Sequence, residues 1–253
     1  MDWIVVVPSY NRPGAIKEKT LAVLDFHKIP HNKIYVFVAN EDQKKQYLES
    51  IGDTYNIVVG VKGLAQIRNF IFNYFPIGTK LVSFDDDVKK FVKLADGKLI
   101  DFEESELVQL INTGFEECEK SGAKLWGTYP VSTNAYFMKN TITHDFKFIV
   151  GSFWGCINPG AEIQITSGDE KEDYMRTILF WIRDKKIVRI NYVAHRTSCY
   201  FGAGGLQSDG TDARIAKQKA IVEKLLELYP QYIRINTRRK SIYPEILLRR
   251  QKK

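Results

Sequence analysis

The chain has 253 residues, 44% of them apolar, and its net charge is +7. This composition suits one sizeable globular domain, and no apolar run reaches the ~18 residues of a membrane span. The three cysteines lie far apart and the start, MDWIVVVPSY, has no signal-peptide pattern, so we expect a reducing, intracellular setting.

The first third of the chain alternates apolar, β-branched runs with polar or amphipathic stretches. The runs predict buried strands, and the stretches between them predict helices. Strands are expected at residues 3–10, 33–40, 55–61 and 79–84, and helices at residues 14–28, 41–52 and 63–75. This alternation favours an α/β fold with a Rossmann-like, mostly parallel central sheet flanked by helices.

The rest of the chain mixes longer helical periodicities with less regular strands. Helices are expected at residues 101–122, 169–185 and 210–230, and strands at residues 124–138, 146–160 and 185–195. No linker rich in Pro, Gly and Ser intervenes, so we expect a mixed α+β portion on the same sheet. The tail, residues 231–253, either wraps the core or is partly mobile.

The positive charge is concentrated near the C-terminus. Residues 214–253 hold twelve Lys and Arg and three acids, a net charge of +9, so the rest of the chain is at −2. Such a segment indicates a polyanionic partner such as nucleic acid, or an anionic surface, unless it is a solvated helix face with a frayed tail.

Polar residues gather where the predicted strands end. Ligands of open α/β sheets bind at the carboxyl ends of the strands, so these residues are expected to line one edge of the sheet. They are Pro8, Ser9, Tyr10, Asn11 and Arg12 after the first strand, Glu41 after the second, Gly63, Gln66, Arg68 and Asn69 after the third, and Asp85, Asp86 and Asp87 after the fourth.

Three consecutive acids at the end of a buried strand repel one another and need a positive partner. Mg²⁺ and Mn²⁺ prefer one or two carboxylates together with phosphate oxygens. Alternation along an extended segment would place Asp85 and Asp87 on one side, to hold a metal or a ribose, and Asp86 on the other. Arg12 and Arg68 could hold phosphate oxygens. The alternative is that the acids cap a helix or solvate a turn.

A second acidic pair, Glu172 and Asp173, opens a predicted helix. Either could be a general base, with Asp173 preferred, or both could simply favour the helix dipole. His195 ends an apolar strand and is either a metal ligand or a hydrogen-bonded core histidine.

Two further groups could contact a second substrate. The rings of Phe153 and Trp154 could stack on an acceptor, or they could belong to the core. Gly204 and Gly205 lie in a glycine-rich loop that could approach a ligand closely.

Over roughly residues 3–200 these clusters resemble the nucleotide-sugar glycosyltransferases of the GT-A type. Pro8–Arg12 resembles the start of that family's nucleotide pocket, and Asp85–Asp87 resembles its metal-binding D-x-D motif. Glu172–Asp173 resembles its acceptor-side acid, and His195 stands where a histidine often completes the metal site.

The resemblance implies transfer of a sugar from a nucleoside-diphosphate sugar, expected to be a UDP-sugar, to a hydroxyl acceptor, with Mn²⁺ or Mg²⁺ as cofactor. Residues 1–212 would form the transferase domain, with a nucleotide-sugar half over 1–100 and an acceptor half over 101–212. Residues 213–253 would form a basic helix and tail packed on the same domain.

A narrower resemblance rests on VVPSYNRP, VVGVKGLAQIRNFI and SFDDDV, which are similar to the TET-associated glycosyltransferases. That family is proposed to glycosylate 5-hydroxymethylpyrimidines in DNA, often in viruses. The resemblance implies DNA as the acceptor and a cytoplasmic or host-intracellular location, not a secreted one. The residues expected to track the DNA phosphates are Lys217, Lys219, Arg234, Arg238, Arg239 and Lys240.

Three other functions fit parts of the sequence. The first is a GT-A enzyme with a glycan, lipid or protein acceptor, and the second is a non-catalytic DNA-binding protein with a transferase-like fold. The third is a nucleotidyltransferase, but PSYNRPG is a poor match to the glycine-rich signature expected after its first strand. The sequence leaves the sugar, the stereochemistry and the oligomeric state open.

Overall fold

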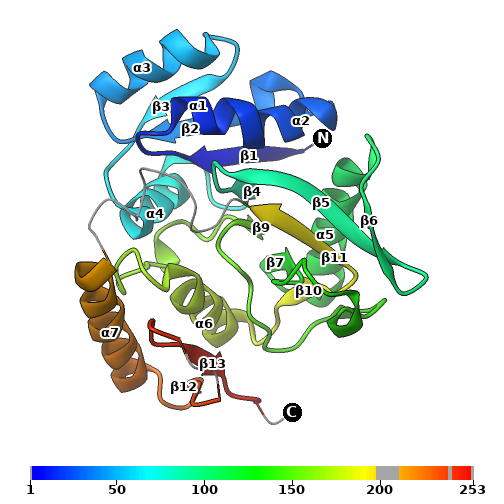
Figure 1. Cartoon of the computed structure of the whole chain (residues 1–253), viewed down its shortest axis with the longest axis vertical. Coiled ribbons are helices and arrows are strands. Elements are labelled where there is room, and N and C mark those ends of the chain that lie inside the picture. The colour runs from blue at the N-terminus through cyan, green and yellow to red at the C-terminus, as the bar shows by residue number, and fades with distance from the viewer. Residues whose placement is uncertain (1, 198–210, 239–240, 252–253) are drawn as a thin grey trace.

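The computed structural model describes residues 2–197, 211–238 and 241–251. Its main sheet has eight strands in the order β3-β2-β1-β4-β9-β7-β10-β8 (Figure 1). They are β1 (Trp3–Pro8), β2 (Ile34–Val38), β3 (Asn56–Val59), β4 (Lys80–Phe84), β7 (Leu125–Thr128), β8 (Ile142–Thr143), β9 (Phe153–Ile157) and β10 (Val188–Ile190).

The four strands of the first third pair in parallel, as the sequence predicts. β9 runs antiparallel between β4 and β7, β10 is parallel to β7, and β8 is antiparallel at the edge. The expected α/β class with a mostly parallel central sheet is therefore confirmed.

Two smaller sheets accompany the main one. β5 (Val88–Ala95) pairs with β6 (Lys98–Asp101) and with β11 (Val193–Thr197), and β12 (Ile233–Ile235) pairs with β13 (Ile246–Leu248), all antiparallel. Neither hairpin was predicted from the sequence. For β5–β6 a signal exists, because Asp96 and Gly97 have φ of 49° and 74°, and Asp-Gly favours the two-residue hairpin turn that needs such angles.

The helices cover both faces of the main sheet. The longer ones are α3 (Glu41–Ile51), α4 (Leu64–Tyr74), α5 (Glu106–Ser121), α6 (Glu172–Asp184) and α7 (Thr211–Leu228). The first helical region divides into α1 (Pro13–Ile16), the π-helical η1 (Lys17–Leu21) and α2 (Ala22–Phe26), and short 3-10 turns are η2 (His31–Lys33), η3 (Ala135–Phe137) and η4 (Gly160–Glu162). None of the helices in the described ranges is both long and apolar enough for a membrane crossing.

Two hydrophobic clusters lie on opposite sides of the sheet, because side chains alternate along each strand. One packs α1–α3 and α5 against the sheet, and the other packs α4, α6 and α7 (Figure 1). Val222 and Leu225 of α7, Ile233 of β12 and Ile246 of β13 belong to the second cluster. The basic C-terminal segment is thus anchored in the core through its apolar side chains.

The register of the central strands fixes the position of the site. β1 pairs with β2 up to Pro8 and Phe37, and with β4 up to Val6 and Ser83. All three strands run the same way, so the segments that leave β1 and β4 emerge side by side at one edge. The triple acid therefore follows β4 next to the loop that follows β1.

Candidate active site at the carboxyl ends of β1 and β4

Asp86 ties the loop after β1 to the turn after β4. Its buried carboxylate accepts a hydrogen bond from Ser9 Oγ (2.6 Å) and pairs with Arg12 Nη1 (3.2 Å). Tyr47, fully buried on α3, lies 2.6 Å from Ser9 Oγ through its hydroxyl, which also accepts from the Arg12 amide (3.1 Å). Asp86, Ser9 and Arg12 thus brace one another. Tyr47 was not among the residues predicted at the site, although a buried tyrosine needs a partner for its hydroxyl.

Asp85 turns the other way and meets Arg68. Arg68 Nη2 donates to Asp85 Oδ1 (2.8 Å) and to the Gly151 carbonyl (3.1 Å), and Nη1 donates to Ser83 Oγ. Burial raises the pKa of Asp85 to about 7, against the lowering effect of the Arg68 charge. Arg68 was expected to bind phosphate, but it is only 1% exposed, so its role is corrected to holding Asp85.

Asp87 is half-buried, and its carboxylate has no hydrogen-bond or ion-pair partner within the described ranges. Burial, and then the charge of Asp86, raise its pKa. The turn itself is braced by Thr20 of η1, whose hydroxyl donates to the Asp85 carbonyl (2.6 Å) and accepts from the Val88 amide (3.0 Å). The backbone is thus fixed while the Asp87 carboxylate stays unpartnered.

The donor set fits a hard divalent cation that shares its ligands with a phosphate. Asp87, and the oxygen of Asp85 that does not meet Arg68, are available, and the Asp85 side chain is 34% exposed. Within the described part of the chain, no three or more His, Cys, Asp or Glu converge into a metal cage. Mg²⁺ and Mn²⁺ commonly take only one or two carboxylates and complete their shell with substrate phosphates and water.

His195 lies on β11 and is buried. Its Nε2 lies 2.6 Å from Ser152 Oγ and its Nδ1 lies 3.3 Å from Thr128 Oγ1, so both ring nitrogens face hydroxyl groups. Burial lowers its pKa to about 4, which keeps the imidazole neutral. These contacts favour the hydrogen-bonded alternative over the metal ligand.

The structure separates the two acids at the start of α6. Glu172 is 3% exposed and pairs with two buried arginines, Arg176 through Nη1 (3.1 Å) and Arg68 through Nε (3.6 Å). Arg176 also lies over the ring of Trp154, 4.0 Å from its centroid. Glu172, expected as a catalytic candidate, is thus held within a buried ionic network.

Asp173 faces a different environment. Its carboxylate accepts hydrogen bonds from the amides of Gly151 (3.3 Å) and Tyr174 (2.9 Å) and makes no ion pair with a described residue. Burial, and then the charge of Glu172, raise its pKa to about 6. A carboxyl group that titrates near neutrality suits proton transfer, so the geometry favours Asp173 over Glu172.

The start of α4 is held by the loop that precedes α6. Asn69 makes two hydrogen bonds to the backbone of Ile165 (2.9 and 3.0 Å), and Asp169 accepts from the Ala65 amide (2.9 Å), capping the helix. Gly63 has φ of 102°, which other residues rarely adopt. Asn69, expected in the nucleotide pocket, instead joins the two halves of the site.

For the remaining residues expected at the nucleotide pocket, that role stays a prediction. Lys62 Nζ lies over the Tyr10 ring, 5.3 Å from its centroid, and Asn11, with φ of 55°, accepts from Gln43 Nε2 (2.9 Å). Pro8 is buried at the end of β1, and Glu41 and Gln66 are exposed near the same edge.

The acceptor-side aromatic residues belong to the core. Phe153 is fully buried in one hydrophobic cluster, and Trp154 is 2% exposed in the other, where the guanidinium groups of Arg68 and Arg176 lie over its ring. Neither ring is open to an acceptor, which corrects that expectation. Gly204 and Gly205 lie outside the described residues.

The basic residues expected at DNA lie on α7 and the hairpin after it. Lys217 and Lys219 are exposed on α7, and Arg234 and Arg238 are exposed on and beside β12. Arg239 and Lys240 lie outside the described residues. Arg249 and Arg250 were not among the predicted DNA-binding residues, but the hairpin brings them close to Arg234.

Comparison with sequence profiles of protein families finds no match, and a search of curated proteins finds none either. Solved structures do match. S. aureus TarS 1-349 shares 15% identity with a TM-score of 0.50, covering 91% of this chain and 72% of that one. Glucosyl-3-phosphoglycerate synthase (GpgS) from Mycobacterium tuberculosis, solved with Mn²⁺, UDP-glucose and phosphoglyceric acid, shares 12% identity with a TM-score of 0.51, covering 92% and 83%. The chain therefore has the fold of GT-A glycosyltransferases.

Proposed function

We propose that the protein is a metal-dependent glycosyltransferase that moves a sugar from a nucleoside-diphosphate sugar, a UDP-sugar, to a hydroxyl acceptor. One observation carries the proposal. The two-residue segment Gly151–Ser152 links the triple-acid turn to Asp173, because the Ser152 carbonyl accepts from the Asp85 amide (2.9 Å) and the Gly151 amide donates to Asp173 (3.3 Å). Carboxylates suited to a metal and a carboxyl group suited to a base therefore flank one short segment.

The donor side of the proposal uses Asp87 and the outer oxygen of Asp85 as cation ligands. A divalent cation there would neutralise the charge that develops on the leaving diphosphate. Arg68 hydrogen-bonds the inner oxygen of Asp85, and the Thr20 hydroxyl fixes the backbone of the turn. The two carboxylates are therefore positioned before the donor arrives. That a neighbour with the same fold was solved with Mn²⁺ and UDP-glucose supports this donor class.

The acceptor side uses Asp173 as the proton acceptor. In its ionised form it would take the proton of the acceptor hydroxyl as the new sugar bond forms. Its raised pKa makes it a stronger base than an ordinary aspartate, and the Gly151 and Tyr174 amides hold its orientation. Glu172 and the two buried arginines keep the first turn of α6 in place.

For the acceptor we propose 5-hydroxymethylpyrimidine in DNA. The stretches that resemble the TET-associated glycosyltransferases support this, as does the basic C-terminal segment. A base inside a duplex would have to be extruded, or presented from single-stranded DNA, to reach Asp173. If the protein cleaves the donor but adds no sugar to DNA, the experiment would point to a glycan, lipid or protein acceptor.

The test incubates the protein with Mn²⁺, a panel of UDP-sugars, and DNA carrying 5-hydroxymethylcytosine, 5-hydroxymethyluracil or unmodified bases. Nucleoside mass spectrometry detects sugar transfer to the DNA, and the release of UDP measures cleavage of the donor. Asp87→Ala is expected to abolish both signals, and Asp53→Ala, which removes an exposed aspartate after α3, is the matched control. A hexose-sized gain on unmodified bases, or full activity in Asp87→Ala, would contradict the proposal.

A further inference from the structure

The excess positive charge of the protein resides in its last 23 residues. Residues 231–253 contain eight Lys and Arg and one acid, a net charge of +7, whereas the other 230 residues contain 29 of each sign. The body of the protein is therefore neutral overall. A general attraction of the whole surface to anions is not expected, and any polyanion should be drawn to this segment.

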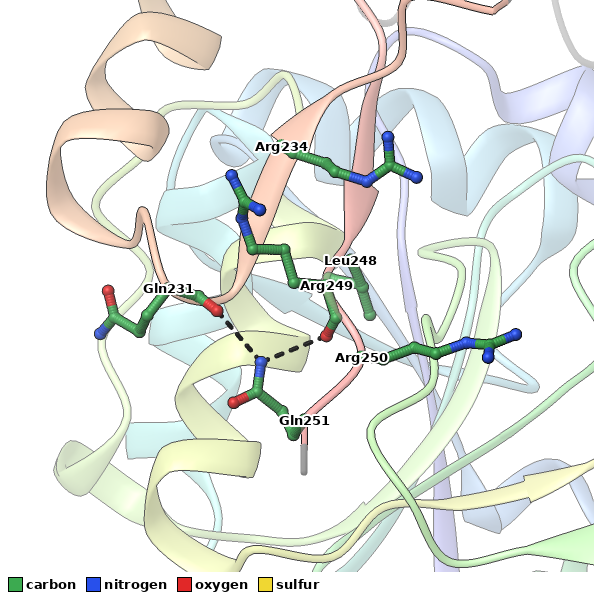
Figure 2. Close-up of a pocket in the computed structure, with 6 residues that line it drawn as sticks. All are labelled: Gln231, Arg234, Leu248, Arg249, Arg250 and Gln251. Carbon is green, nitrogen blue, oxygen red and sulfur yellow. Dashed lines mark hydrogen bonds between the residues drawn. The ribbon is translucent and has the colours of Figure 1, made fainter. Parts of the chain in front are cut away.

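Within the described residues of this segment, the paired strands β12 and β13 bring distant arginines together. β12 and β13 pair with Arg234 opposite Leu247, so Arg249 and Arg250 follow β13 beside β12. An open hollow of about 780 Å³ lies here, lined by Gln231, Arg234, Leu248, Arg249, Arg250 and Gln251 (Figure 2).

No carboxylate of the described residues neutralises the guanidinium groups around the hollow. Arg234, Arg249 and Arg250 are exposed, and none forms an ion pair with a carboxylate in the described ranges. Arg249 folds back on β12, where its Nε donates to the Ile233 carbonyl (2.8 Å). In Figure 2 the Arg234 and Arg250 side chains extend away from the hairpin toward the same side.

We propose that this arginine hollow is a docking surface for the phosphodiester backbone of single-stranded nucleic acid, separate from the donor and metal site. Guanidinium groups present a planar fork of N–H donors that matches two phosphate oxygens. The exposed Gln231 side chain adds a neutral hydrogen-bonding group, whereas Gln251 Nε2 already donates to the Gln231 and Arg249 carbonyls. A concave basic surface that tracks a backbone is how proteins hold single-stranded nucleic acid without reading its sequence.

The docking surface lies close to the acceptor side of the candidate active site. The Tyr174 hydroxyl donates to the Ile246 carbonyl of β13 (2.8 Å), and Tyr174 directly follows Asp173 on α6. The path from Asp173 to Arg234 runs along the Tyr174 side chain to Ile246 and then across the β12–β13 pair. The lengths of these steps place Arg234 within roughly 20 Å of Asp173. The idea that the docked nucleic acid is also the acceptor rests on the proposed function. The binding of nucleic acid to the arginine hollow does not depend on that function.

The shape of the surface favours a strand over a membrane. A lipid surface would be met by a flat or protruding basic face with apolar side chains beside it. Ile235 and Ile242 are exposed on this hairpin, but the arginines line a hollow. Anionic vesicles are therefore an arm of the test.

The test measures binding of a fluorescein-labelled, single-stranded oligothymidylate 20-mer by anisotropy, in EDTA and without donor, from 50 to 200 mM salt. The variant Arg234→Gln/Arg250→Gln removes two charges and spares Arg249, which also contacts β12. The control Lys45→Gln/Lys98→Gln removes two exposed charges from α3 and β6, on the far side of the molecule (Figure 1). Circular dichroism checks that each variant is folded.

Two lost phosphate contacts should lower the salt slope by about 1.4, so the wild-type protein loses about sevenfold more affinity than the variant over this range. The control should keep the wild-type slope, and unlabelled polyphosphate should displace the oligonucleotide. Asp87→Ala should bind like wild type, because binding needs neither metal nor transfer. If the protein binds the oligonucleotide but transfers no sugar to DNA, the proposed DNA acceptor is refuted and the docking surface still stands.

Three results would overturn the proposal. The first is a wild-type protein that does not bind the oligonucleotide. The second is a control variant that weakens binding as much as the arginine variant, since net charge alone would then explain the affinity. The third is a wild-type protein that sediments with phosphatidylglycerol vesicles but does not bind the oligonucleotide, together with an arginine variant that no longer sediments with the vesicles.

Discussion

Replacing His195 should change how the stability of the protein depends on pH. Burial lowers the pKa of His195 to about 4, below the ~6.5 of an unfolded histidine. Between these values the unfolded chain binds a proton that the folded protein does not. The stabilisation is therefore complete above about pH 6.5 and is lost progressively as the pH falls toward 4.

The size of the effect follows from the same two values. Proton linkage gives a loss of about 2 kcal/mol in the free energy of unfolding between pH 7 and pH 5 from this one group. Asp85 and Asp173, whose pKa values are raised to about 7 and about 6, act in the opposite direction, because they favour the folded state at lower pH. The informative quantity is thus the difference between wild type and His195→Gln.

Urea unfolding at pH 7 and pH 5 measures this difference. His195→Gln is expected to be less stable at pH 7, because it loses packing against Phe91 and Phe153, but to lose about 2 kcal/mol less than wild type on acidification. His144→Gln, which removes an exposed histidine beside Glu117, is the control. Parallel pH curves for wild type and His195→Gln would refute the buried, neutral histidine. So would a Mn²⁺-dependent rise in melting temperature that only His195→Gln lacks, since that would mark a metal ligand.

Three further predictions concern the site itself. Asp173→Asn should lower kcat by about 10²–10⁴-fold, and wild-type activity should rise with pH through about 6, a limb that the variant lacks; near-normal kcat would exclude a base role. Arg68→Met should lower the free energy of unfolding by about 3–5 kcal/mol in urea, since Asp85 and Glu172 lose their shared partner; a loss below 1 kcal/mol would show that the ionic network relaxes. Tyr47→Phe should cost about 1 kcal/mol and weaken UDP-sugar binding in calorimetry without changing the pH profile; unchanged donor affinity would mean that its hydroxyl does not position the loop after β1.

The strand–helix alternation of the first third was predictable because each element carries its own signal. β-branched apolar runs mark β1 to β4, and the parallel sheet then brings their carboxyl ends together. The position of Asp85–Asp87 beside the loop after β1 follows from this topology alone. What sequence could not give is the partner of each acid, because Arg68 and Tyr47 reach them from different helices.

Several functional expectations failed because burial cannot be read from residue type. Trp154 and Phe153 sit on β9, which inserts antiparallel into the middle of the sheet and directs one ring to each core. His195 was expected at the end of a strand but lies in the middle of β11, where Ser152, just before β9, and Thr128 of β7 lie beside its two ring nitrogens. These contacts join residues more than 40 positions apart, and local patterns carry no information about them.

The acids of α6 illustrate the same limit on a smaller scale. Glu172 and Asp173 are adjacent and equally suited to a helix start, so sequence alone left both open. The helical turn places Glu172 four residues before Arg176, which gives the ion pair, and turns Asp173 toward Gly151. One rotation along the helix thus separates a structural acid from a candidate base.

The measurement that tests the account most directly is donor cleavage by wild type and Asp87→Ala across a Mn²⁺ titration, with UDP release as the readout. The account predicts release that requires Mn²⁺, saturates with it, and is absent in Asp87→Ala, while both proteins unfold at similar urea concentrations. Metal-independent release, or release that survives in Asp87→Ala, would contradict the assignment of the Asp85–Asp87 turn as the donor and metal site.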